Sequence, residues 1–221
     1  MTFTINPKTI FKKLLFIILI LLILNLIDTY YRVYLGHTVA FSRILAYFNL
    51  GYENNIPTLY ATLSLFLSSL LLLIIGLKNN NKKIKSFQWV GLSIVFLFLG
   101  MDEMFQIHEK FNGIVGGKIE TTGFLYYGWV IPYFILTFIF LIIYLKFLMA
   151  LEPRIRKLFI LSGAIFVVGA IGLEMIAANY MYSNNTDTTD INVFLFGTVE
   201  EVLEMLGIAL FIYTLLTYIK S

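Results

Sequence analysis

The chain has 221 residues, of which 59% are hydrophobic and only 13% are charged, and its mean hydropathy is +0.86. A soluble domain of this size could not bury so much apolar surface, so the composition indicates an integral membrane protein. The net charge of +3 comes from short clusters of Lys and Arg between apolar runs, which argues against nucleic acid as a partner, and the lack of cysteine excludes disulfides, zinc–thiolate sites and thiol nucleophiles.

Six apolar runs are long enough to cross a membrane, since a hydrocarbon core about 30 Å thick requires roughly 20 residues of helix. They cover residues 13–30, 56–77, 87–108, 124–149, 157–180 and 192–218. The connections between them are short, so residues 1–221 are expected to form a single domain. The predicted fold class is all-α: a polytopic membrane protein built as a six-transmembrane-helix bundle. The first run resembles a signal peptide, but DTYYRVYLG follows it instead of a cleavage site, so it is expected to remain as a helix.

The basic residues predict the orientation of the bundle. Lys and Arg gather in the N-terminal tail, in the loop 78–86 and in the region 150–157, whereas the alternate loops hold only Arg32, Arg43, Lys110 and Lys118. Under the positive-inside rule, both termini are then cytoplasmic, in the bacterial cytoplasmic (inner) membrane.

Small residues are concentrated in the fifth run. They are Gly163, Ala164, Gly169, Ala170, Gly172, Ala177 and Ala178. Because small residues let neighbouring helices approach closely, this helix is expected at the centre of the bundle.

Acidic residues interrupt three of the apolar runs. The third run carries Asp102 and Glu103, the fifth carries Glu174, and the sixth carries Glu200, Glu201 and Glu204. Counting along the predicted topology places all six acids at a similar depth, in the outer half of the membrane. At 100° per residue, the three acids of the sixth run fit within about 100° of arc, and Asp102, Gln106 and Glu109 fit within about 60°. Each of these two helices is expected to present a polar stripe.

An ionised carboxylate at mid-membrane costs roughly 2.5–3.5 kcal/mol, and no Lys or Arg lies near these acids within their runs. Three resolutions remain open: several of the carboxyl groups hold protons, a metal cation binds among them, or a basic residue of the outer loops folds down to pair with them. Those basic residues are Arg32, Arg43, Lys110 and Lys118. The predicted cation- or proton-binding residues are Asp102, Glu103, Glu174, Glu200, Glu201 and Glu204.

A divalent metal cation is the candidate cofactor, because a bundle rich in carboxylates suits Mg, Ca, Mn or a dinuclear iron or manganese centre. His108 and Glu109 are the candidate metal ligands outside the six acids. The Glu-x-x-His motif of di-iron bundles is absent, however, and HEKFN is not the His-Glu-x-x-His motif of zinc hydrolases. A hydrogen-bonding role for His108 at the membrane interface remains the alternative.

The segments MDEMFQIHE, EEVLEMLG and YENNIPTLY resemble those of a family of bacterial multi-pass membrane proteins without an assigned activity. The resemblance covers most of the chain. It implies six helices and a location in the membrane, and it carries no activity or catalytic residue that could be transferred.

Three function classes remain open on the residues alone. The first is proton- or cation-coupled transport or permeation, the second is a metal-dependent membrane enzyme acting on a lipid-like substrate, and the third is a structural or assembly subunit. The lipid bilayer is the expected partner in each case. A transporter of 221 residues is also expected to form a homo-oligomer.

Overall fold

The computed structural model describes residues 6–35, 40–78, 84–116 and 121–220. Within these ranges the regular structure is entirely helical, and six helices are long and apolar enough to cross a membrane. Their bounds are Pro7–Tyr34, Ile56–Lys78, Ser86–Phe105, Val130–Ala150, Pro153–Asn184 and Ile191–Lys220. The predicted fold class, an all-α multi-pass membrane protein, is confirmed.

The first half of the chain supplies three of the spans and the short helices that connect them. Asn6 begins the first span: its side chain accepts a hydrogen bond from the backbone N–H of Lys8 at 3.0 Å, and Pro7 occupies the first helical position. In chain order the elements are α1 (Pro7–Tyr30), the π-helical turn η1 (Tyr31–Leu35), α2 (Ala40–Leu45), the short 3-10 helix η2 (Ala46–Phe48), α3 (Ile56–Lys78), α4 (Ser86–Phe105) and α5 (Ile107–Gly116).

The second half begins with the 3-10 turn η3 (Gly123–Leu125) and α6 (Val130–Ala150). The fifth span is a continuous helix in three parts: α7 (Pro153–Val167), the π-helical segment η4 (Val168–Leu173) and α8 (Glu174–Asn184). The sixth span is α9 (Ile191–Lys220). A π-helical segment changes the direction of the side chains that follow it, and here the first of those is Glu174.

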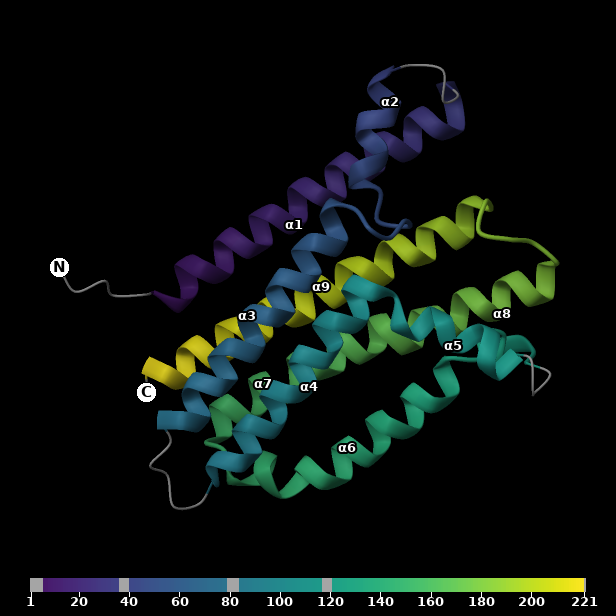
Figure 1. The fold of residues 1–221 in the computed structure, drawn as a ribbon. Coiled ribbons are helices and arrows are strands. Elements are labelled where there is room, and N and C mark those ends of the chain that lie inside the picture. Colours follow the sequence, from purple (N-terminus) through teal and green to yellow (C-terminus); the bar gives the residue numbers. More distant parts are fainter. Residues whose placement is uncertain (1–5, 36–39, 79–83, 117–120, 221) are drawn as a thin grey trace.

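The central helix of the bundle is α9, which packs against α1, α3, α7, η4 and α8 (Figure 1). The fifth span, expected at the centre, instead lies on one side of α9. Its small residues still have the expected effect: a Cβ on Gly169 would lie 3.0 Å from the backbone oxygen of Glu200. A Cβ on Gly207 of α9 would lie 2.8 Å from the backbone nitrogen of Phe166. Glycine at these two positions lets the fifth and sixth spans approach to backbone contact.

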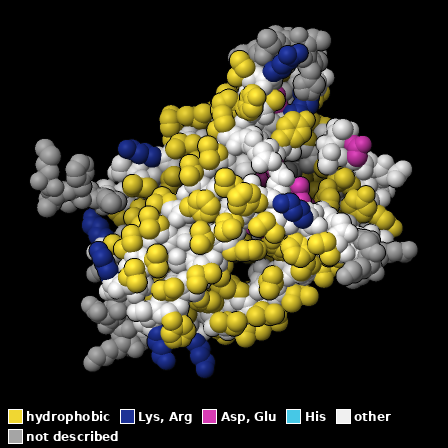
Figure 2. All heavy atoms as spheres, viewed as in Figure 1, with side chains coloured by type: hydrophobic (Ala, Val, Ile, Leu, Met, Phe, Trp, Pro, Cys, Tyr) yellow, Lys and Arg dark blue, Asp and Glu magenta, His cyan; other side chains and the backbone are white. Residues whose placement is uncertain are grey.

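The largest hydrophobic cluster lies toward the end of the bundle that carries both chain ends (Figure 1). Trp89, Phe147, Phe159, Phe211 and Leu215 are its main members, and the rings of Trp89 and Phe147 meet edge to face with centroids 4.8 Å apart. Helix α6 lies on the opposite side of the bundle from α1 and exposes most of its apolar side chains (Figure 1). Figure 2 shows hydrophobic side chains over much of one face, as expected for a surface in contact with lipid.

Candidate functional site

A break in the third span shapes the candidate site. The expected helix over 87–108 ends at Phe105, because Gln106 takes the left-handed conformation with a φ of 52°, and α5 starts at Ile107. Asp102 stabilises this break: its Oδ1 atom accepts a hydrogen bond from the backbone N–H of His108 at 2.7 Å. The stripe expected from Asp102, Gln106 and Glu109 required one uninterrupted helix. The predicted stripe is therefore wrong. Asp102 contacts His108 across the break instead.

His108 connects three parts of the structure. Its Nδ1 atom lies 3.2 Å from Oδ1 of Asp102 in α4, and its Nε2 atom lies 3.8 Å from Oε1 of Glu53, in the loop before α3. The imidazole ring also packs on Trp129, with ring centroids 4.9 Å apart. These contacts fit the alternative role given to His108, that of a hydrogen-bonding residue at the membrane interface.

His108 and Glu53, which both lie outside the spans, have shifted pKa values. Burial disfavours the charged imidazole of His108, but the hydrogen bond and charge of Asp102, together with the charges of Glu53 and Glu103, raise its pKa to about 9. Burial, followed by repulsion from Glu109, raises the pKa of Glu53 to about 7. At neutral pH, His108 is therefore a cation among carboxyl groups.

The carboxyl groups of Glu174 in α8 and Glu200 in α9 lie within hydrogen-bonding reach of each other. An ionised carboxylate only accepts hydrogen bonds, so a hydrogen bond across this contact needs a proton on one of the two groups. Trp129 approaches the pair from the start of α6, and its indole N–H points to Oε1 of Glu174 at 3.4 Å. Because the same indole ring packs on His108, Trp129 lies between the imidazole and the carboxyl pair.

The other predicted acids interact with this group at longer range. Glu201 interacts electrostatically with Glu103, Glu204, Glu53 and Glu174. Glu204 interacts with Glu103 and with His108. The close approach of η4 to α9 at Gly169 explains how Glu204 comes near the fifth span, since a Cβ on Gly169 would lie 3.2 Å from its Cγ atom.

The described residues do not offer a ligand set for a metal ion. Among them, no three His, Asp or Glu side chains are grouped so that they could hold one. Of the two candidate metal ligands, His108 is engaged with Asp102 and Glu53, and Glu109 is exposed on α5.

Among the described residues, the basic residues of the loops expected on the outer side do not form ion pairs with the six acids. Arg32 pairs with Asp28 at 2.6 Å, while Arg43 and Lys110 are exposed, and Lys118 lies outside the described residues. Within the described ranges, the ion pairs are this one and the two of His108. The third resolution, pairing with a basic residue of the loops, is therefore wrong for Arg32. Among the described residues, the cation that pairs with one of the six acids is His108.

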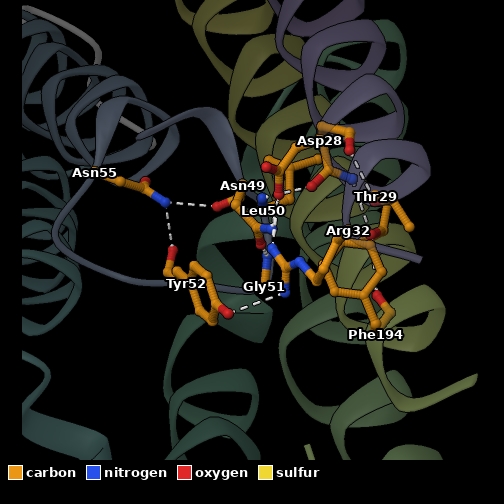
Figure 3. A network of polar contacts seen from close by, with 11 residues as sticks. Asp28, Thr29, Arg32, Asn49, Leu50, Gly51, Tyr52, Asn55 and Phe194 are labelled. Carbon is orange, nitrogen blue, oxygen red and sulfur yellow. Dashed lines mark hydrogen bonds and ion pairs between the residues drawn. The ribbon is translucent and has the colours of Figure 1, made fainter. Parts of the chain in front are cut away.

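A polar network that the sequence did not predict holds the segment from Asn49 to Asn55, between α1 and α3, in place (Figure 3). Oδ2 of Asp28, which is fully buried in α1, accepts hydrogen bonds from Arg32 and from Asn49, each at 2.6 Å. Arg32 also donates to the hydroxyl of Tyr52 at 2.9 Å. Asn55 joins the network by donating to the backbone oxygens of Asn49 and Tyr52.

A second buried amide connects the same loop to the sixth span. Asn25 donates to the hydroxyl of Thr198 in α9 at 3.1 Å and accepts from the backbone N–H of Leu50 at 2.8 Å. These contacts hold the loop at Asn49 and Leu50, before Gly51, and at Tyr52, after it. Glu53 is the next residue along the chain. The polar residues of NLID inside an apolar run are the one signal in the sequence that points to this network, because buried polar groups in a membrane span need partners.

Comparison with known proteins places the chain in a family. Residues 14–219 match the family described as "Domain of unknown function (DUF8692)", and the chain belongs to it. No curated protein and no solved structure matches the chain. This agrees with the resemblance drawn from the acidic motifs, which carried no activity to transfer.

Proposed function

We propose that the protein binds and releases protons at its intramembrane carboxyl groups and that these groups let protons permeate across the membrane. The observation that carries the proposal is the close approach of the carboxyl groups of Glu174 and Glu200, since two such groups can form a hydrogen bond to each other only when one of them holds a proton. Carboxyl groups that face one another inside a membrane bundle are characteristic of proton pathways.

The surroundings of the pair favour protons over a metal ion as the positive partner. The described acids do not form a metal ligand set, and their nearest cation is an imidazole, which can itself take up and release a proton. His108 also lies beside Glu53 in the outer loop, so a titratable group near the aqueous surface adjoins the intramembrane acids. These contacts suggest that protons enter from the outer side through Glu53 and His108.

The direction follows from the proposed topology, with both termini in the cytoplasm of a bacterial cell and the acids in the outer half of the inner membrane. The ends of α1 and α9 lie together in Figure 1, and α1 begins among lysines. This agrees with the positive-inside rule for both termini. A homo-oligomer remains our expectation for a transporter of this length.

Proton flux in proteoliposomes tests the proposal. Vesicles that contain a trapped pH-sensitive dye should acidify when the outside is made acidic, and Glu200→Gln should reduce the initial rate by at least about tenfold, because it removes the shared proton site. Glu152→Gln is the matched control, since it makes the same chemical change at an exposed acid before α7. Equal flux in Glu200→Gln, Glu152→Gln and protein-free vesicles contradicts a proton-conducting role.

A further inference from the structure

A pocket of about 420 Å³ opens at the start of α7. Pro153, Arg154, Lys157 and Leu158 of α7 line it on one side, and Tyr213 of α9 lines it on the other. The ring of Tyr213 also packs against Phe11 of α1, with ring centroids 5.3 Å apart. The pocket therefore lies between the fifth and sixth spans, near the start of α7.

Two exposed cationic side chains line the pocket. Arg154 and Lys157 are exposed, lie three residues apart and so share one face of α7, and neither forms an ion pair with any residue of the described ranges. The neighbouring Arg156 differs, because its guanidinium points at the backbone oxygen of Met149 at 3.4 Å. Glu152 precedes the pocket but does not line it.

The remaining walls of the pocket are apolar. Leu158 lies one turn further into the span than Arg154, and the ring of Tyr213 lies against Phe11. A ligand that fits these walls carries negative charge at the membrane surface and apolar chains that run along the helices into the bilayer. Basic pockets between membrane helices bind lipid headgroups for this reason.

We propose that this pocket binds the phosphate headgroup of an anionic phospholipid. Arg154 and Lys157 bind the phosphate, and the acyl chains lie against the apolar surface that continues from Leu158 along α7. The same phosphate chemistry occurs in free inorganic phosphate, but only the lipid uses the apolar walls.

Native mass spectrometry tests the proposal on the full-length protein in neutral detergent, titrated with phosphatidylglycerol. The variant that carries both Arg154→Gln and Lys157→Gln should require roughly thirtyfold more phosphatidylglycerol for half-saturation, as expected from the loss of two basic contacts at a membrane surface. The matched control carries Lys78→Gln and Lys220→Gln, which remove two exposed charges from the last turns of α3 and α9. It should bind like the wild type, and phosphatidylcholine should bind weakly to all three proteins.

Three results overturn the proposal. If the pocket variant and the control lose affinity equally, general surface charge attracts the lipid. If inorganic phosphate competes fully at the same concentration as phosphatidylglycerol, the pocket is a free anion site. If the wild type does not prefer phosphatidylglycerol over phosphatidylcholine, the pocket does not select an anionic headgroup.

Discussion

Asp102 and His108 are joined twice across a helix break: one carboxylate oxygen accepts the backbone N–H of His108 at 2.7 Å and lies 3.2 Å from its Nδ1 atom. The first contact caps the start of α5, and the second fixes the imidazole beside the membrane acids. Asp102 therefore lies at the end of α4, caps the start of α5 and favours the charged form of the His108 imidazole.

Asp102→Asn should lower the pKa of His108. The amide oxygen can still accept the backbone hydrogen bond, but the negative charge that favours the imidazolium is gone, so the pKa should move from about 9 toward the ordinary value of 6.5. An NMR titration of histidine-labelled protein measures it, with His37→Gln used to assign the two histidine signals. Glu152→Gln, at an exposed acid before α7, is the control. An unchanged midpoint in Asp102→Asn means that Asp102 does not stabilise the charged ring.

Thermal stability should fall as the pH rises from acid to alkaline. Glu53 and His108 both have folded-state pKa values above their ordinary values, about 7 against 4.5 and about 9 against 6.5. The folded protein therefore binds these protons more tightly than the unfolded chain. The stabilisation from Glu53 is complete below pH 4.5 and lost as the pH rises through about 7, and that from His108 is complete below pH 6.5 and lost through about 9.

Matched variants separate the two contributions to this pH dependence. Relative to the wild type, Glu53→Gln should flatten the change in melting temperature over the lower range, and His108→Gln should flatten it over the upper range. The His108 contribution is at most about 3 kcal/mol, from a pKa difference of about 2.5. A wild-type melting temperature that rises between pH 7 and 9, with the same rise in His108→Gln, would falsify the assigned direction.

Gly169→Ala should destabilise the bundle by about 1–3 kcal/mol, because the new methyl group meets the backbone oxygen of Glu200 at 3.0 Å and Cβ of Leu203 at 3.1 Å. Gly163→Ala is a control in the same span, since a Cβ there meets no atom within 4 Å and alanine favours the helix. Unfolding in mixed micelles with increasing sodium dodecyl sulfate measures both. If the two variants unfold alike, η4 and α9 are not in backbone contact at Gly169.

Single cysteines test the proposed topology, and the chain contains no native cysteine to remove. In intact cells, a membrane-impermeant maleimide should label Asp187→Cys, which is exposed between α8 and α9, and should leave Lys220→Cys unlabelled until the cells are opened. The reverse pattern inverts the orientation, and with it the proposed side of proton entry.

Much of the fold follows from the sequence because long apolar helices are dictated by the bilayer. The second predicted span, 56–77, and the helix Ile56–Lys78 differ by one residue, since charged loops bound the apolar run on both sides. The fourth differs more: it was expected from residue 124, yet α6 begins at Val130 after the turn at Gly123, where φ is 57°. The aromatic residues around that turn are hydrophobic, so the sequence pattern includes them in the apolar run although they lie outside the helix.

The site depends on contacts that periodicity does not contain. The acids could be named from the sequence, because charges inside apolar runs are costly. Their partners could not, because the break at Gln106 is stabilised by Asp102, and the position of Glu53 depends on the contacts of Asn25 and Asp28 with the loop between α1 and α3. The pairing of Glu174 with Glu200 depends in turn on the register of two helices that meet at glycines.

The infrared spectrum of the purified protein in lipid at neutral pH tests the central claim most directly. The shared hydrogen bond of Glu174 and Glu200 predicts a carbonyl band from a protonated carboxyl group, which disappears in Glu200→Gln and persists in Glu152→Gln. A wild-type spectrum without such a band, or one whose band is unchanged in Glu200→Gln, would contradict the proposal that these residues hold a proton.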